Sequence, residues 1–324
     1  MMNQEISSLI AKLENNLREA SSTLYDIKQK LSELEPSTTE KPLAKSVKIQ
    51  IAAPTLKPII TDPGDPIDYK TNDWPLAADP YTIVSNKNDI ERRMRAMQIV
   101  SLCDIKTGTK VLDFGCGDAF SSREFAEKSQ STVGYDIRKH VFWDDASCKE
   151  YINNKSLILT TDQDIVQSHA PYDHIIMYDV LDHIETEDPV SILKWLKSML
   201  TDTGKLFVRT HPWTSRHGGH LYESNQVLGN KAYLHLALTP DELTMAGLTV
   251  LPNIRVTRPF ANYDSMFDKS GLKTISRRPH TRDVEQYIID NMLDRIIKIT
   301  WNGEVNRETA VKIMTTMFID YTLG

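Results

Sequence analysis

The sequence lacks most of the features that mark secreted or membrane-embedded proteins. Its 324 residues include only three cysteines, Cys103, Cys116 and Cys148, an odd number without the spacing of a zinc site. No apolar run approaches the length of a membrane span, and the N-terminus has no basic region followed by an apolar core. We therefore expect no disulfide framework, no signal peptide, no membrane partner and a cytoplasmic location.

A strong net charge is also missing. The formal net charge is -6, and this mild acidity disfavours a protein built mainly to hold a phosphate backbone. Hydrophobic residues make up 40% of the chain and charged residues 25%, which is ordinary for a globular protein, so the length predicts one main domain with appendages. We interpret one local basic stretch as a solvated charged turn, and contact with phosphate is the alternative; the stretch contains Lys273, Arg277, Arg278, His280 and Arg282.

The N-terminal part carries a heptad pattern that is separate from the rest of the chain. It predicts a coiled-coil helix over residues 1–35 that joins chains into a homo-oligomer; packing of the helix on its own domain is the alternative. Frequent prolines and scarce glycine predict an extended linker over residues 36–80, part of which could lie against a surface. The apolar heptad positions are Ile6, Ile10, Leu13, Leu17, Ala20, Leu24, Ile27, Leu31 and Leu34.

Short apolar segments alternate with helical patterns in the central part of the chain. This alternation predicts an α/β fold with a doubly wound, mostly parallel sheet in a domain over residues 81–265. Beyond it, apolar residues at helical spacing from Val284 to Ile299 and from Val311 to Tyr321 predict a C-terminal helical extension over residues 266–324. The expected strands are 110–114, 132–136, 157–161, 172–178 and 205–209, and the expected helices include 121–129, 190–200 and 241–246.

A glycine-rich turn follows the first expected strand. Gly115 and Gly117 stand where this strand runs into a helix, and glycine there lets the backbone approach a ligand closely. Phe120 occupies the place of the third glycine in a nicotinamide or flavin fingerprint, which argues against those cofactors. Asp136 ends the next strand, at the position where an acid accepts hydrogen bonds from ribose hydroxyls.

The following strands also end in acids, Asp162 and Asp179. Taken in order, these segments resemble the motifs of class I S-adenosylmethionine-dependent methyltransferases over about residues 85–260. Residues 113–117 (Asp-Phe-Gly-Cys-Gly) resemble the glycine-rich first motif of that family. Residues 179–184 (Asp-Val-Leu-Asp-His-Ile) resemble the D-V-L-E-H-I run of its small-molecule and sugar-modifying branches, and residues 235–248 resemble a later stretch of the same branches.

The resemblance implies a Rossmann-like methyltransferase fold and S-adenosylmethionine as the cofactor. Carboxylates suit a cofactor that is positively charged at both its sulfur and its amine. For each acid the alternative is a structural role as a cap at the end of a strand. The resemblance places Gly115 and Gly117 under the methionine part, Asp113 near its amino group, Asp136 at the ribose hydroxyls, Asp162 with Gln163 at the adenine amine, and Asp179 beside the sulfonium.

Histidines supply the candidates for proton removal, because imidazole titrates near neutral pH. The catalytic candidates are His183, His211 and His220; a structural hydrogen bond is the alternative for each. No acid or cysteine completes a familiar ligand spacing in the histidine-rich stretch 211–222, so we expect no metal. We interpret this stretch as a substrate loop, and the substrate candidates in and around it are Arg209, Trp213, Arg216, His217, Tyr222 and His235.

These patterns predict an enzyme that moves a methyl group from S-adenosylmethionine to an oxygen or nitrogen acceptor on a small molecule, sugar or glycan. No Asn/Asp-Pro-Pro-aromatic run follows the fourth strand, and no Pro-Cys pair is present, so the motifs of DNA methyltransferases are missing. This disfavours nucleic acid as a partner. A nucleic-acid or protein methyltransferase, and a methyltransferase-like assembly protein without activity, are the alternatives.

Overall fold

The computed structural model describes residues 67–77, 89–154, 156–184, 189–248 and 263–324. The predicted coiled-coil helix and most of the predicted linker lie outside the described residues. None of the helices in the described ranges combines the length and the apolar composition that a membrane span requires.

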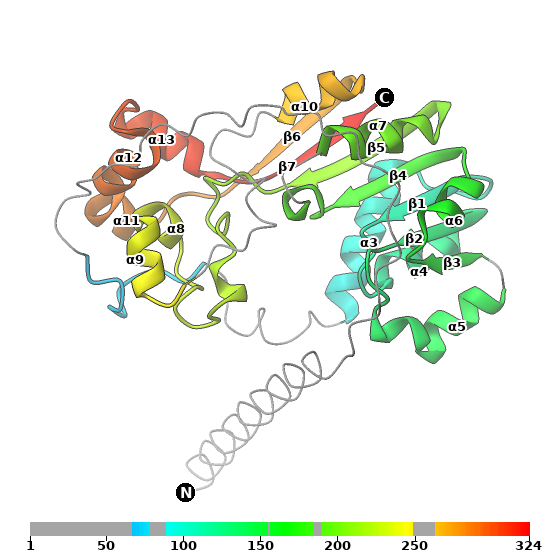
Figure 1. The fold of residues 1–324 in the computed structure, drawn as a ribbon, viewed down its shortest axis with the longest axis horizontal. Coiled ribbons are helices and arrows are strands. Elements are labelled where there is room, and N and C mark those ends of the chain that lie inside the picture. Colours follow the sequence, from blue (N-terminus) through cyan, green and yellow to red (C-terminus); the bar gives the residue numbers. More distant parts are fainter. Residues whose placement is uncertain (1–66, 78–88, 155, 185–188, 249–262) are drawn as a thin grey trace, which may run out of the picture. The chain divides into compact units, whose positions relative to one another are not determined.

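Seven strands form one sheet in the order β3-β2-β1-β4-β5-β7-β6 (Figure 1). Strands β1 to β5 pair in parallel, whereas β7 runs antiparallel to both of its neighbours. The predicted doubly wound, mostly parallel sheet is therefore confirmed. The strands are β1 (Lys110–Phe114), β2 (Ser131–Tyr135), β3 (Leu157–Thr160), β4 (Tyr172–Tyr178), β5 (Leu200–Thr210), β6 (Thr274–Thr281) and β7 (Thr316–Leu323).

Helices cover both faces of this sheet (Figure 1). Val111 of β1 and Ile176 of β4 pack on one face with residues of α3 and α4, and the neighbouring Leu112 and Ile175 pack on the other face with α6, α7 and α10. Successive side chains of a strand point to opposite faces, so strands buried on both sides read as continuous apolar runs. The helices are α3 (Asp89–Cys103), α4 (Phe120–Lys128), α5 (Ala146–Asn153), α6 (Gln163–Ser168), α7 (Pro189–Ser198) and α10 (Tyr263–Ser270).

A second hydrophobic core, here called the helical cluster, is built from two insertions into the sheet. The first, between β5 and β6, contains α8 (Leu234–Ala237) and α9 (Pro240–Met245). The second, between β6 and β7, contains α11 (Gln286–Asn291), α12 (Leu293–Trp301) and α13 (Arg307–Met314).

Part of the predicted linker packs against the helical cluster. Trp74 is buried in this core, and its Nε1 donates a hydrogen bond to the carbonyl of Ala232 at 2.8 Å. Leu76 forms a bridge with Lys231 in the same region. Residues 67–77 are therefore an integral part of the folded structure.

The prediction of a helical extension over residues 266–324 is wrong for two segments, because β6 and β7 belong to the central sheet. The apolar residues after Met314, which we placed on a helical face, lie in β7. There Ile319, Tyr321 and Leu323 pack into the same hydrophobic core at every second position, which is the period of a strand. The chain leaves the sheet to form α11, α12 and α13 and then returns to it.

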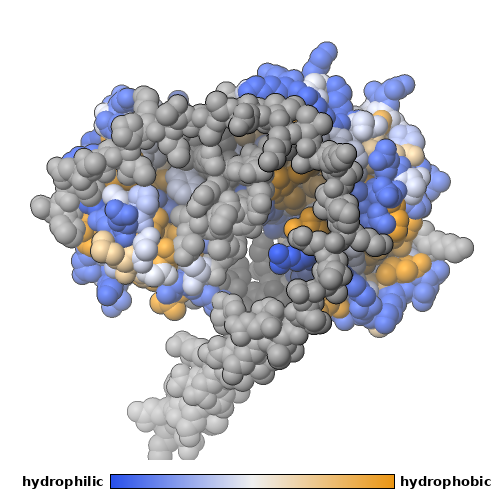
Figure 2. Space-filling model, viewed as in Figure 1, coloured by the Kyte–Doolittle hydropathy of each residue, from blue (hydrophilic) through white to orange (hydrophobic). Residues whose placement is uncertain are grey.

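The basic stretch that we interpreted as a charged turn lies largely in the edge strand β6. Most residues of this strand, including Arg277 and Arg278, are exposed. Charged side chains on an edge strand protect it from pairing with other chains. On the face drawn in Figure 2, hydrophilic residues cover much of the described surface and hydrophobic residues form separate areas.

Candidate functional site

The glycine-rich turn between β1 and α4 borders a cavity of about 220 Å³ at the carboxyl ends of the parallel strands. Gly115 and Gly117 have φ angles of 79° and 53°, in the left-handed region that favours glycine. A Cβ atom on Gly115 would overlap the side chain of Val180 after β4, whereas a Cβ atom on Gly117 would meet no atom within 4 Å. Gly115 is thus required for close packing, and Gly117 leaves open space beside the turn.

Carboxylates from three segments line this cavity, namely Asp113, Asp118 and Asp179. Asp113 is buried at the end of β1, where the hydroxyl of Ser122 donates a hydrogen bond to its Oδ2 at 2.6 Å. Burial raises the pKa of Asp113 to about 7, although the bond from Ser122 opposes this shift. A positively charged group of a ligand beside Asp113 would keep this carboxyl ionised.

Two arginines of α3, which no sequence motif marked as site residues, also line the cavity. Arg92 pairs with Asp118, and Arg95 pairs with Asp179. The arginines are three residues apart on one helix, so they lie on the same face. This spacing was visible in the sequence, but the acids that they meet come from other segments.

The remaining cofactor candidates follow β2 and β3, outside the set of residues that line this cavity. Asp136 accepts a hydrogen bond from the backbone N–H of Gly117 at 2.9 Å, which joins the end of β2 to the glycine-rich turn. Asp162 is the N-cap of α6 and accepts from the N–H of Asp164 at 2.8 Å. Gln163 donates to the hydroxyl of Tyr135 at 3.3 Å. The capping role that was the alternative for Asp162 is therefore present in the structure.

Histidines from two loops gather beside Asp179. His211, after β5, donates from Nε2 to Oδ1 of Asp179 at 3.1 Å, and its Nδ1 lies 3.2 Å from the carbonyl oxygen of Met317. Burial lowers the pKa of His211. The hydrogen bond to Asp179 and the negative charge of that carboxylate outweigh burial, so the pKa of His211 is raised overall. Burial likewise raises the pKa of Asp179, but His211 and Arg95 bring it below the ordinary range, so the pair is charged.

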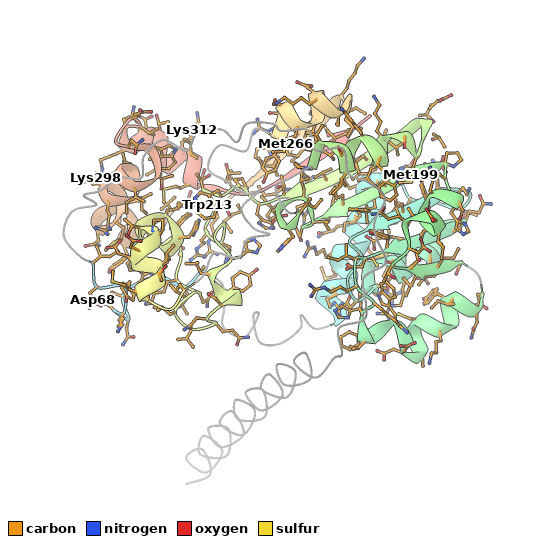
Figure 3. The ribbon with its side chains drawn as sticks, in the orientation of Figure 1. Asp68, Met199, Trp213, Met266, Lys298 and Lys312 are labelled. Atoms are coloured by element: carbon orange, nitrogen blue, oxygen red, sulfur yellow. The ribbon has the colours of Figure 1, made fainter. Side chains whose placement is uncertain are left out.

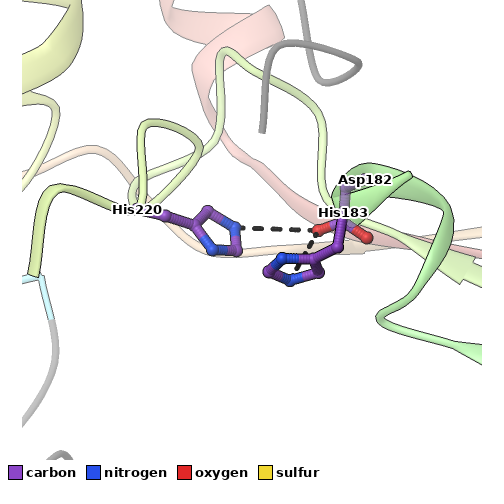
Figure 4. Close-up of side chains that lie close together, drawn as sticks. All are labelled: Asp182, His183 and His220. Carbon is purple, nitrogen blue, oxygen red and sulfur yellow. Dashed lines mark ion pairs between the residues drawn. The ribbon is translucent and has the colours of Figure 1, made fainter. Parts of the chain in front are cut away.

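His183 and His220 lie around Asp182 (Figure 4). Together with His211, these three residues are called the histidine group below. Asp182 is fully buried, and its Oδ2 lies 3.9 Å from Nε2 of His183 and 3.6 Å from Nε2 of His220. Burial raises the pKa of Asp182, and the charges of His211 and His183 oppose this shift. The three catalytic candidates are thus brought together, and Asp182, which sequence analysis treated only as part of a motif, is at their centre.

The two arginines expected to contact substrate have carboxylate partners within the chain. Arg209 donates from Nε to Oδ1 of Asp320 on β7 at 2.7 Å, and its guanidinium stacks on Phe318. Arg216 is buried, pairs with Glu285 and donates to the carbonyl of Leu76 at 2.6 Å. Arg209 therefore links β5 to β7, and Arg216 links the loop after β5 to Glu285 and to the segment that contains Leu76.

Three of the other substrate candidates lie in the loop between β5 and α8, and His235 lies in α8 itself. His235 is buried and bonds through Nε2 to the carbonyl of Trp213 at 2.7 Å; burial lowers the pKa of His235 to about 3. Burial also lowers the pKa of His217, to about 4. Trp213, labelled in Figure 3, packs against the helical cluster, and the hydroxyl of Tyr222 lies 3.3 Å from Nδ1 of His220. These residues connect the helical cluster to the histidine group.

The geometry fits the cofactor that the sequence resemblance implies. Carboxylates line a cavity beside a turn whose glycines expose backbone, and such carboxylates stabilise the positive charges of a sulfonium and an amine. In doubly wound sheets, ligands bind at the carboxyl ends of the strands, where this cavity lies.

Comparison with known proteins identifies the family. The model of a methyltransferase domain family matches residues 89–275. Among solved structures, the chain is similar to a SAM-dependent methyltransferase from Archaeoglobus fulgidus, with 13% identity, coverage of 75% of this chain and 97% of that chain, and a TM-score of 0.42. It is also similar to magnesium protoporphyrin IX methyltransferase from Synechocystis PCC 6803, with 16% identity, coverage of 72% and 83%, and a TM-score of 0.42. A search of curated protein sequences finds no significant match. Because the family model covers more than half of the chain, the chain belongs to the class I S-adenosylmethionine-dependent methyltransferases, and S-adenosylmethionine is its cofactor.

Proposed function

We propose that this enzyme methylates an oxygen or nitrogen atom of a small molecule, sugar or glycan. The observation that carries the proposal is the position of Asp179, which lines the cavity and also accepts a hydrogen bond from His211. One carboxylate thus links the cofactor cavity to the histidine group. An acceptor bound beside this group would have its nucleophilic atom next to titratable side chains.

On the cofactor side, the acids and glycines of the strand ends hold the ligand. The bound cofactor supplies an electrophilic methyl group on a sulfonium. Asp113 and Asp179 would stabilise its positive charges, the turn at Gly115 and Gly117 would admit the methionine part, and Asp136 would accept the ribose hydroxyls. We propose Asp162 and Gln163 for the adenine amine.

An exposed apolar side chain supports this orientation of the cofactor. Ile137 directly follows Asp136 and is 75% exposed. An adenine ring packed on it would remove apolar surface from water. Asp136, the proposed partner of the ribose, and Ile137, the proposed apolar contact of the adenine ring, are therefore neighbours at the end of β2.

On the acceptor side, the three histidines differ in what they can do. Both ring nitrogens of His211 face oxygen atoms of the chain, so its role is to hold Asp179 in position. The side chain of His183 is 33% exposed and that of His220 is 7% exposed. His183 is therefore the imidazole with the best access to an acceptor, and one of its nitrogens can accept the proton that an O–H or N–H group loses.

The loop between β5 and α8 would form the other wall of the acceptor site. We keep Trp213, His217 and Tyr222 as proposed substrate contacts, since they are only partly buried. The other three candidates already bond to groups of the chain and would instead hold this loop on the sheet and the helical cluster; they are Arg209, Arg216 and His235.

A screen with labelled methyl groups across acceptor classes tests the proposal. Small molecules, sugars, glycans, proteins, RNA and DNA are each incubated with the full-length enzyme and labelled S-adenosylmethionine. We expect transfer to a member of the first three classes. Labelling of proteins or nucleic acids alone would show that the acceptor class is wrong, and retained cofactor binding without transfer in any class would favour an assembly protein.

Variants on the accepted substrate then test the histidine. His183→Ala should lower kcat at least about 100-fold, within the usual range for removal of a general base, while the affinity for S-adenosylhomocysteine is unchanged. His280→Ala is the matched control, because the side chain of His280 is 32% exposed and also pairs with an aspartate, Asp320. Full turnover in the His183 variant would remove this residue from the reaction.

A further inference from the structure

We propose that Asp182, His183 and His220 form a binding site for a divalent transition-metal ion. Each residue offers one ligand atom, and these atoms all lie within 4.8 Å of one another (Figure 4). One carboxylate and two imidazoles are a common ligand set for Zn²⁺ and for Fe²⁺ or related ions. The inference runs against our expectation of no metal, which considered the histidine-rich loop without Asp182.

The distances within the group suit a shared ion better than direct hydrogen bonds. Oδ2 of Asp182 lies 3.6 Å and 3.9 Å from the two Nε2 atoms, beyond hydrogen-bond length. Two ligand atoms that are each about 2.1 Å from one ion at a tetrahedral angle lie about 3.4 Å apart. The two distances from Asp182 exceed this value by about 0.2 Å and 0.5 Å, and the ligand atoms of the two imidazoles, which lie within 4.8 Å of each other, would also have to approach to complete three coordination bonds.

The carboxylate of Asp182 provides an independent observation. Asp182 has no exposed surface, and neither of its oxygens has a hydrogen-bond partner among the described residues. Buried polar atoms are nearly always hydrogen-bonded, because leaving water without a new partner is costly. The dashed lines of Figure 4 join Oδ2 to both imidazoles, so a cation held between these three side chains would give this oxygen a partner.

The backbone and the surrounding side chains orient His220 for coordination. Its φ angle of 46° lies in the left-handed region, which is uncommon for residues other than glycine, although histidine adopts it more often than most. The hydroxyl of Tyr222 lies 3.3 Å from its Nδ1. If Nδ1 carries the proton and donates it to Tyr222, Nε2 presents its lone pair toward Asp182, an arrangement that metal-binding histidines usually have.

Three protein ligands leave at least one coordination position for another molecule. The partly exposed side of His183 gives access to it. Here the inference rests on the proposed function: the open position would take an oxygen or nitrogen atom of the methyl acceptor. With the cation bound, both imidazoles donate lone pairs to it and no longer serve as bases. The charge of the ion would then lower the pKa of the bound O–H or N–H group, and the proton would pass to solvent water.

Metal binding by the full-length protein, without a histidine tag, tests the inference directly. The protein is treated with a chelator, dialysed, and titrated with Co²⁺ while its visible absorption is followed; Zn²⁺ and Mn²⁺ are titrated by calorimetry. We expect about one ion per chain and a Co²⁺ spectrum with nitrogen and oxygen ligands. Asp182→Asn, His183→Gln and His220→Gln should each weaken binding at least tenfold, and His280→Gln should leave it unchanged.

Circular dichroism and S-adenosylhomocysteine affinity show whether each variant is folded. No saturable binding of any of the three ions to the wild-type protein would overturn the inference, as would equal binding by all variants. Methylation that proceeds fully in chelator without bound metal would also overturn it, yet would leave the proposed function intact. If the protein bound the ion but transferred methyl groups to no acceptor, the metal site would be supported and the proposed function would be contradicted.

Discussion

Asp179 and His211 are joined by a charge-assisted hydrogen bond of 3.1 Å between Oδ1 and Nε2, and Arg95 pairs with the other carboxylate oxygen. Asp179 itself adopts a left-handed φ of 57°, which is uncommon for a residue other than glycine. The backbone after β4 is therefore held in a conformation that presents this carboxylate to the cavity and to the histidine group at once.

Replacement of Asp179 by asparagine should weaken cofactor binding. The amide can still accept a bond from His211, but it neither neutralises Arg95 nor attracts a sulfonium. Hydrogen bonds to charged groups contribute about 1.5–3 kcal/mol, so we expect the Kd for S-adenosylmethionine to rise about tenfold or more in calorimetry. Asp202→Asn, which changes an exposed aspartate on the same sheet, is the control. An unchanged Kd in Asp179→Asn would show that this carboxylate does not contact the cofactor.

The two glycines of the first motif should respond differently to alanine. In Gly115→Ala the new Cβ overlaps Val180, so we expect a lower melting temperature together with weaker cofactor binding. In Gly117→Ala no atom of the chain opposes the Cβ, so only the left-handed φ destabilises the protein, by about 1–2 kcal/mol. Its main effect should be on cofactor affinity.

A second substitution separates packing from backbone strain at Gly115. The double variant Gly115→Ala with Val180→Ala removes the overlapping methyl groups, so its melting temperature should recover part of the loss seen in Gly115→Ala. Val180→Ala alone is the reference for the double variant. No recovery would assign the whole effect to the φ of 79°.

Much of the sheet could be predicted from the sequence because its central strands are buried on both faces. Lys110–Phe114 and Tyr172–Tyr178 were predicted with the observed bounds, since each is a short, mostly apolar run bounded by polar residues. β6 could not be found in this way because nearly all of its side chains are exposed and no apolar alternation marks it. β7 was missed because the helical spacing of α13 continues by chance into the strand, which hides the alternation of Ile319 and Tyr321.

The candidate site was predictable only where its residues follow consecutive strands. The acids Asp113, Asp136 and Asp179 lie at strand ends, and parallel strands bring such ends to one edge of the sheet. By contrast, His220 meets Asp182 only because the loop after β5 folds back toward the end of β4. No spacing within the sequence encodes that contact, so the ligand set with Asp182 could be found only in three dimensions.

Buried His235 should make the protein less stable in mild acid. Burial lowers its pKa to about 3 in the folded state, whereas an unfolded histidine titrates near 6.5. Between these values the unfolded state binds more protons, so the stability that is present above pH 6.5 is lost as the pH falls toward 3, by about 1.4 kcal/mol per unit. Urea unfolding at several pH values should show a smaller pH dependence for His235→Gln than for the wild type.

Gln can still donate to the carbonyl of Trp213, so this variant removes the titration while keeping the hydrogen bond. The exposed His140 offers the matched control, and His140→Gln should have the pH dependence of the wild type. If His235→Gln lost stability on acidification as steeply as the wild type, the loss would have to come from other groups, of which buried His217 is the next candidate.

The N-terminal heptads predict that the full-length protein is an oligomer. Nine consecutive apolar a and d positions from Ile6 to Leu34 would leave a long apolar stripe in water unless it is covered. Light scattering should therefore report a mass of at least two chains, and deletion of residues 1–35 should lower it to that of one chain. The proposed cofactor residues all lie beyond residue 110, so the deletion should leave the Kd for S-adenosylmethionine nearly unchanged.

Several chains held together in this way, each on a proline-rich tether, would gain effective concentration on a repetitive target such as a glycan. The labelled-methyl assay distinguishes this role from simple assembly: the deletion variant should methylate a short acceptor as fast as the full-length protein and a long polymer more slowly. A full-length monomer would contradict self-association and favour packing of the helix on its own domain or on another protein. Loss of cofactor binding on deletion would instead place part of the N-terminal segment within the catalytic unit.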